Sequence, residues 1–253
     1  MSTAGEGVQR IGKELLARVG LHVSRGPANR FEAMERAIAD LRARGYAPRA
    51  VIDGGANVGR WTELTHSTFP NAAYFLVEPQ PACLPLLEAV KERLPAVEVF
   101  NCALTQPGVD SVGMVGSGSD STSEGAWIPT SGESADGLQV KAATLDSLFA
   151  DRFQVQDRVF LKLDLEGYEY NAFLGATELL KCVEVILSEV RFYDVSCSGH
   201  QVFSQIVSLL LSHGFIVYDF ARLVARPRDG RLFFGDALFV RSDSELAADV
   251  QWR

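Results

Sequence analysis

Short runs of apolar residues alternate along this chain with segments whose apolar residues have helical spacing. Helices are predicted at 8–20, 28–44, 57–67, 80–93 and 199–212. Strands are predicted at 50–53, 73–78, 97–101, 159–165, 183–190, 214–220 and 231–240. Strands and helices that alternate in this order indicate an α/β fold, in which parallel strands are joined by right-handed helical crossovers.

The same pattern divides the chain into regions. An N-terminal helical extension is expected over 1–47, a sheet domain over 48–241 and a short tail over 242–253. The alternation is interrupted by an insert at 108–137, where Ser, Gly and Asp cluster around Trp127 and Pro129. Such a stretch is a long loop or hairpin, and it is either a binding loop or a mobile surface excursion. With 253 residues, the chain is long enough to bury a substantial core.

A glycine-rich turn follows the first strand, in the segment A-V-I-D-G-G-A-N-V-G at 50–59. Its glycines, at 54, 55 and 59, allow a tight turn and a close approach to a ligand. The spacing differs from the G-x-G-x-x-G fingerprint of dinucleotide sites, and no G-x-x-x-x-G-K-[ST] loop occurs in the chain. We expect the carboxylate of Asp53 to face the ligand, where it would repel a pyrophosphate and attract a cation. S-adenosylmethionine fits, because it carries an amino group and a sulfonium.

A second acid, Glu78, ends the second strand. A carboxylate at this position can accept hydrogen bonds from both ribose hydroxyls of an adenosine. The alternative is a charge at the start of the next helix, before Pro79, because acids favour helix N-termini. The pair of acids at two neighbouring strand tips favours the adenosine interpretation.

Three charged residues interrupt the strand predicted at 159–165 and the residues that follow it. Lys162, Asp164 and Glu166 are costly to bury unless they are paired or functional. Lys162 and Asp164 are two positions apart, so they point to one face of a strand and can pair.

A general base for proton transfer is expected among the polar residues near the strand tips. The candidates are Asp164, Glu166, Glu189 and His200. The three acids also have structural interpretations: Asp164 could pair with Lys162, Glu166 could cap the helix after Gly167, and Glu189 could pair with Arg191. A divalent metal held by Asp164, Glu189 and a substrate diol is open, but no ligand spacing requires it.

Composition narrows the function classes. The net charge of −8 argues against nonspecific binding of nucleic acid, which depends on clustered Lys and Arg. No apolar run reaches the roughly 18 residues of a membrane span, and the N-terminus lacks the layout of a signal peptide, so a soluble cytoplasmic protein is expected. The four cysteines are scattered without a C-x-x-C pair, which indicates neither a zinc site nor a disulfide framework. A small-molecule or glycan acceptor is therefore favoured.

Five segments, in order along the chain, resemble motifs of the FkbM-type S-adenosylmethionine-dependent methyltransferases. They are V-I-D-G-G-A-N-V-G, V-E-P, T-L-D-S-L, L-K-L-D-L-E-G-Y-E and L-S-E-V. The resemblance covers about residues 48–241. It implies a class I Rossmann-like fold, with a seven-stranded mostly parallel sheet, one antiparallel strand and helices on both faces. It also implies methyl transfer to a hydroxyl of a sugar or polyketide-like natural product. The cofactor-binding residues would be Asp53, Gly54, Gly55, Ala56, Asn57, Gly59, Glu78, Asn101, Ala103 and Asp164.

Other functions stay open at this point. A protein that binds S-adenosylmethionine without turnover could keep the same fold. A methyltransferase acting on an amine is a further alternative, although its usual N-P-P-[YF] signature is absent. The N-terminal helices could form a homodimer surface, and the identity of the acceptor is not encoded in the cofactor motifs.

Overall fold

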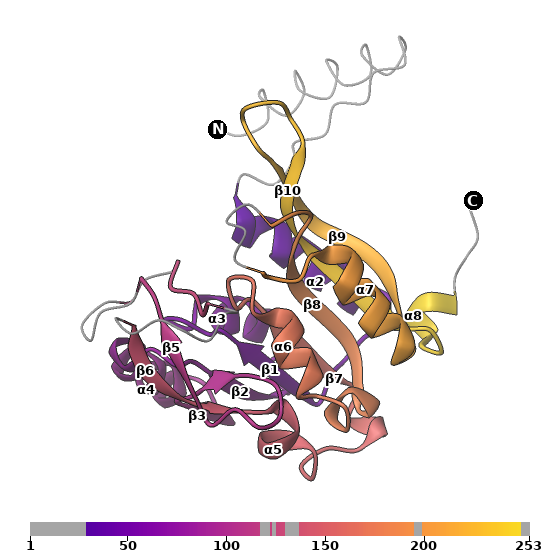
Figure 1. Cartoon of the computed structure of the whole chain (residues 1–253). Helices are drawn as coiled ribbons and strands as arrows, with labels where there is room; N and C mark the ends of the chain where they lie inside the picture. The colour runs from indigo at the N-terminus through magenta and orange to yellow at the C-terminus, as the bar shows by residue number, and fades with distance from the viewer. Residues whose placement is uncertain (1–28, 117–121, 123–124, 130–136, 195–198, 249–253) are drawn as a thin grey trace, which may run out of the picture.

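The computed structural model describes residues 29–116, 122, 125–129, 137–194 and 199–248. A seven-stranded sheet with the order β3-β2-β1-β7-β8-β10-β9 forms its centre (Figure 1). The strands are β1 (Ala50–Gly54), β2 (Ala73–Val77), β3 (Val97–Phe100), β7 (Val159–Leu163), β8 (Val183–Arg191), β9 (Phe215–Ala225) and β10 (Leu232–Arg241). β10 runs antiparallel to both of its neighbours, and all other pairs are parallel. The mostly parallel sheet with one antiparallel strand is thus confirmed.

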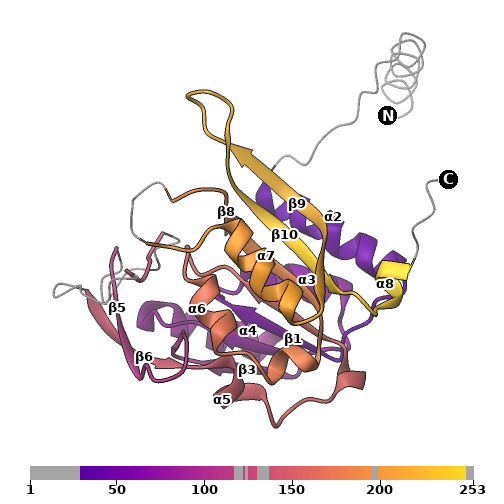
Figure 2. The same cartoon turned by 45° about the vertical axis from the view of Figure 1, so that its right-hand side comes forward.

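Helices cover both faces of this sheet (Figure 2). One face packs against α2 (Arg30–Ala43), α3 (Arg60–Thr68), α4 (Leu84–Arg93) and α8 (Glu245–Ala248). The other face packs against α5 (Leu145–Phe149), α6 (Glu169–Leu174) and α7 (Phe203–Ser212). Successive strand residues point to opposite faces. On β1, Val51 therefore joins the first core and Ile52 the second.

Several boundaries differ from the predicted ones. The helix expected at 57–67 begins at Arg60, because Asn57 and Gly59 have positive φ angles of 46° and 83° and complete the turn first. The helix expected at 199–212 begins at Phe203, and the strand expected to reach residue 165 ends at Leu163. The helix predicted at 8–20 lies outside the described residues.

The described part of the 108–137 insert adds to a small second sheet. This sheet has the order β4-β6-β5, with β4 (Ala103–Leu104), β5 (Ser111–Met114) and β6 (Leu138–Ala143). Three apolar side chains of the insert, Met114, Ala126 and Ile128, pack with Tyr168 in a separate hydrophobic cluster. The insert is therefore anchored to the body beside the carboxyl ends of β7 and β3.

Three short 3₁₀ helices complete the described part of the chain, at Pro81–Cys83, Val155–Asp157 and Leu179–Lys181. Within the described residues, none of the helices combines the length and apolar character that a membrane crossing requires.

Candidate active site

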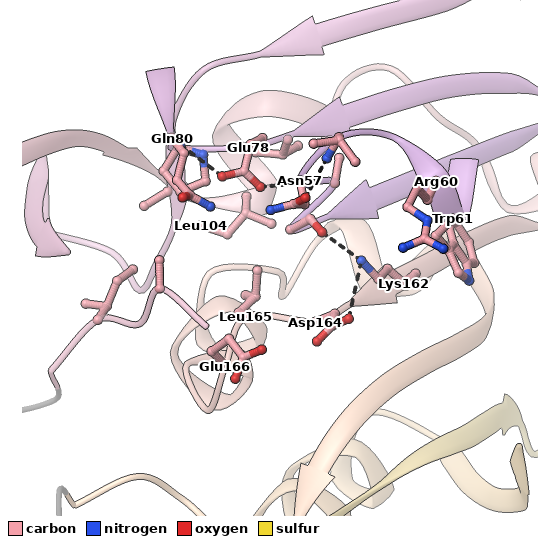
Figure 3. Close-up of a pocket in the computed structure, with 18 of the residues that line it drawn as sticks. Asn57, Arg60, Trp61, Glu78, Gln80, Leu104, Lys162, Asp164, Leu165 and Glu166 are labelled. Atoms are coloured by element: carbon pink, nitrogen blue, oxygen red, sulfur yellow. Dashed lines mark hydrogen bonds and ion pairs between the residues drawn. The ribbon is translucent and has the colours of Figure 1, made fainter. Parts of the chain in front are cut away.

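A cavity of about 430 Å³ lies beyond the carboxyl ends of β1, β2 and β7 (Figure 3). In parallel α/β sheets this edge is where ligands bind, and the volume is in the usual range for small-molecule sites. Glu78 lies on one side of the cavity, and Asp164 and Glu166 lie on another. The first turn of α2 and the side chains of Arg60 and Trp61 form a further wall.

The glycine-rich turn packs against the chain that follows β7. Gly55 has a φ of 73°, and a Cβ atom added there would lie 2.1 Å from the backbone oxygen of Asp164. The amide of Asp164 in turn donates to the carbonyl of Gly54 at 3.1 Å. Only glycine satisfies both the backbone angle and this close contact. The two sequence motifs are therefore one structural unit, in which each fixes the position of the other.

Glu78 is 3% exposed and lies at the end of β2. Its Oε2 accepts the backbone N–H of Asn57 at 2.8 Å, and its Oε1 accepts that of Gln80 at 2.9 Å. Burial raises the pKa of Glu78, while these two amide donors oppose the shift. The side chain of Gln80 also donates to this carboxylate. A carboxylate has about four acceptor sites, so acceptor capacity is left for a ligand hydroxyl.

Asp53 does not take the orientation expected from the sequence. It is fully buried and does not line the cavity. Its Oδ1 accepts the Lys162 ammonium at 2.9 Å and its Oδ2 accepts the Thr62 hydroxyl at 2.7 Å. Burial lowers the pKa of Lys162, but the charge of Asp53 outweighs this effect and the pKa is raised. The acid therefore holds a lysine beneath the turn, because that ion pair satisfies both buried charges.

Lys162 ties the glycine-rich turn to β7. Its ammonium donates to the carbonyls of Gly54 at 3.2 Å and Gly55 at 2.9 Å. It also lies 3.9 Å from Asp164 Oδ2, which confirms the predicted pairing of these two residues (Figure 3).

Two of the residues expected to bind the cofactor, Asn101 and Ala103, have different roles in the structure. Ala103 and its neighbours Cys102 and Leu104 line the cavity. Asn101 does not; its amide donates to the carbonyls of Glu78 at 2.8 Å and Pro79 at 3.1 Å. Asn101 therefore holds the segment after β2 in place rather than facing the cavity.

The loop after β7 presents two acids to the cavity. Glu166 has a positive φ of 55°, and its carboxylate lies 3.3 Å from Arg191. The loop is held from within by Glu169, whose Oε1 accepts the amides of Leu165 at 2.7 Å and Gly167 at 3.3 Å. Burial raises the pKa of Glu169 to about 7. The final Glu of the K-L-D-L-E-G-Y-E segment thus shapes the loop that carries Asp164 and Glu166.

Glu189 contacts a different arginine from the one expected. Its Oε2 accepts Arg30 at 3.0 Å, whereas Arg191 pairs with Glu166. Burial raises the pKa of Glu189 well above its ordinary value, and the negative charge of Asp164 adds to the shift. Glu166 does not cap α6, because it lies before that helix and faces the cavity.

Sequence reasoning missed two residues of this cluster. Asp236 of β10 is fully buried opposite Glu189, and its carboxylate accepts Arg30 at 2.6 Å. A lone acid within the apolar run L-F-F-G-D-A-L-F-V was a signal that could have found it. Arg30 gave no such signal, because an arginine in the first turn of an amphipathic helix is ordinarily a surface residue.

His200 lies away from the cavity. It is 5% exposed, its Nε2 is 3.1 Å from the carbonyl of Ile128, and its ring meets Trp127 edge-on. Burial lowers the pKa of His200. The side chain thus connects the insert to the loop after β7, since its Nδ1 packs against Gly167, next to Glu166, but His200 does not itself line the cavity.

Residues 53–217 match the model of the Methyltransferase FkbM domain, which is more than half of the chain. The chain belongs to the FkbM methyltransferase family. It is an S-adenosylmethionine-dependent methyltransferase with a class I fold. No curated protein matches this FkbM methyltransferase.

Solved structures of other methyltransferases are similar to it. A precorrin-6y C5,15-methyltransferase of Geobacter metallireducens is 14% identical, with 81% of this chain and 87% of that chain covered and a TM-score of 0.43. The 1,6-didemethyltoxoflavin-N1-methyltransferase of Burkholderia thailandensis is 14% identical, with coverages of 83% and 79% and a TM-score of 0.43. The magnesium protoporphyrin IX methyltransferase of Synechocystis PCC 6803 is 12% identical, with coverages of 87% and 87% and a TM-score of 0.45. Similarity at this level says nothing about the acceptor.

The residues present in this FkbM methyltransferase fit the cofactor. Glu78 lines the cavity and keeps acceptor capacity for a ribose hydroxyl. Gly55 brings backbone to the cavity wall, where an added Cβ atom would clash with the Asp164 backbone oxygen. Apolar groups of Ala103, Leu104 and Met114 also line the cavity and suit a purine ring.

Proposed function

We propose that this FkbM methyltransferase methylates a hydroxyl oxygen of a sugar or polyketide-like small molecule. The observation that carries the proposal is the convergence of acids from separate elements beside the cofactor cavity. Asp164, Glu166 and Glu189 each offer a carboxylate oxygen within 4.8 Å of the others. Asp164 and Glu166 line the cavity, so a polar acceptor with several hydroxyl groups would find hydrogen-bond acceptors there.

The reaction requires a base as well as a methyl donor. When bound, S-adenosylmethionine supplies a methyl group on a positively charged sulfur. The acceptor hydroxyl would give up its proton as it receives this methyl group, so a residue of this chain would have to take that proton. An alcohol is a weak acid, so a carboxylate must take the proton during the attack. Asp164 and Glu166 are the acids placed to do so, since both line the cavity.

Glu78, on the far side of the cavity, orients the donor in this proposal. It would hold the ribose across the cavity from the acids of the loop after β7. Lys162 and Asp53 act indirectly, because they keep the turn and the loop in register. Holding two reactants in line is itself a large part of such catalysis.

Calorimetric titration of the purified protein tests the proposal first. Binding of S-adenosylmethionine and of its demethylated product, without binding of NAD, would support the cofactor site and justify a screen of hydroxylated sugars and natural products. Amine acceptors belong in the same screen, and methylation of amines alone would refute oxygen transfer. Cofactor binding without turnover of any acceptor would favour the protein that binds but does not react.

A further inference from the structure

Arg30 lines the cavity but has no role in the proposed reaction as described above. It belongs to the first turn of α2, outside the segment of residues 53–217 that matches the family. Its Nη2 lies 2.6 Å from Asp236 Oδ1, 3.0 Å from Glu189 Oε2 and 3.1 Å from Asp164 Oδ2. Three carboxylates from three positions across the sheet thus surround one nitrogen.

The carboxylates around Arg30 have the arrangement of a cation site. Oxygens of Asp164, Glu166 and Glu189 lie within 4.8 Å of one another, which is close enough for one divalent ion to contact all three. Such oxygens repel one another unless a positive charge lies among them. Arg30 supplies that charge, since its guanidinium contacts two of the three acids and also the buried Asp236.

The guanidinium also faces the cavity. Arg30 lines the cavity, and its side chain is 24% exposed. Within the described parts of the chain, its contacts to acids use Nε and Nη2. The N–H groups of Nη1 are therefore left to donate toward a ligand. Arginine keeps its charge at any ordinary pH, so it can polarise an oxygen without taking a proton from it.

We propose that Arg30 is the resident cation of the acceptor site: it occupies the place that a divalent metal ion would otherwise take among Asp164, Glu166 and Glu189, and it holds Asp164 and Glu189 in position for the acceptor. The position of Arg30 among the acids is supported by the geometry alone, and only its effect on an acceptor oxygen rests on the proposed function. Arg30 acts through the acids that it contacts, so it is a positioning residue.

The test is whether removal of Arg30 opens a metal site. Manganese(II) is titrated into the wild-type protein and into the Arg30→Ala variant, and free ion is measured by electron paramagnetic resonance. The affinity of Arg30→Ala for one manganese ion should exceed that of the wild type by at least roughly tenfold, because Asp164 and Glu189 lose their shared counter-charge. Arg36→Ala is the matched control, since Arg36 is an exposed arginine of the same helix that pairs with Glu32.

Arg30→Lys keeps the proposal testable if the alanine variant fails to fold. Lysine retains one positive charge, so this variant should bind manganese no better than the wild type. Manganese bound by the wild type and abolished by Glu189→Gln would overturn the proposal, as would a folded Arg30→Ala protein without new binding. Titration of each protein with S-adenosylmethionine runs in parallel. If the wild type does not bind S-adenosylmethionine, the proposed function is refuted, but the manganese titrations still test the position of Arg30 among the acids.

Discussion

Gly45 and Gly55 have similar backbone conformations, so alanine substitutions at these two positions can measure what the contact between the glycine-rich turn and the loop after β7 contributes. Gly45 and Gly55 have φ angles of 88° and 73°, in the left-handed region. A methyl group added at Gly45 meets no atom within 4 Å, whereas at Gly55 it would lie 2.1 Å from the Asp164 carbonyl oxygen. Substitution by alanine therefore carries the same backbone strain at both sites and a clash at only one.

The backbone strain sets the expected effect at Gly45. Left-handed backbone costs a residue with a Cβ roughly 1–2 kcal/mol, so Gly45→Ala should lower the free energy of unfolding by that amount. For a chain of this size each kcal/mol lowers the melting temperature by about 2–4 °C. The affinity for S-adenosylmethionine should be unchanged, since Gly45 does not line the cavity.

The effect at Gly55 should be larger and should reach the cofactor. Because a Cβ atom does not approach another heavy atom within 3.0 Å, the Asp164 carbonyl must move by about 0.9 Å from its present 2.1 Å. A displacement of about 1 Å can cost roughly 100-fold in catalysis, or about 2.7 kcal/mol. Gly55→Ala should therefore lose more stability than Gly45→Ala and bind S-adenosylmethionine more weakly.

Thermal unfolding and calorimetric titration of the two variants check this reasoning. Equal losses of stability, together with wild-type cofactor affinity in Gly55→Ala, would show that the close contact with Asp164 does not constrain the turn.

Three further predictions concern the acids. Glu78→Ala should weaken S-adenosylmethionine binding by at least about 1.5 kcal/mol, roughly tenfold, because hydrogen bonds to a charged group are lost; an unchanged dissociation constant would remove Glu78 from the ribose site. The stability of Glu169→Gln relative to the wild type should be greater at pH 8 than at pH 4. In the folded protein the pKa of Glu169 is raised to about 7, so its protonated form stabilises the wild type at low pH. This stabilisation, at most about 3 kcal/mol, is lost as the pH rises through 7. Denaturant unfolding at the two pH values measures it, and a constant difference contradicts it. Asp164→Asn or Glu166→Gln should reduce turnover more than cofactor affinity, and unchanged turnover in both would exclude them as bases.

The position of Glu78 beside the cavity was predictable from the sequence, because it depends only on which residue follows a buried strand. An acid that ends a buried strand must lie at the carboxyl edge of a parallel sheet. The pairing of Lys162 with Asp164 was predictable for the same reason, since the alternation along a strand places both on one side. These inferences required only the direction of a strand and the residues that follow it.

The role of Asp53 was predicted wrongly because the sequence does not show which partner a buried charge finds. The reasoning assigned its carboxylate to a cationic ligand, but Lys162, 109 positions later, occupies it. His200 was proposed as a base because of its residue type, yet it contacts Ile128 and Trp127 of the insert. Both outcomes depend on distances between segments that are far apart along the chain.

The sequence by itself determined the class of fold, the edge of the sheet where the cavity lies and the family, because periodicity and short motifs are properties of neighbouring residues. Only the tertiary structure decided the composition of the acid cluster around Arg30. Arg30, Asp164, Glu189 and Asp236 come from a helix, the loop after β7 and two strands that span 206 positions, and they meet because β10 is inserted beside β8. Their mutual charges have meaning only at the distances that this packing creates, since electrostatic energy depends on separation in space and not along the chain.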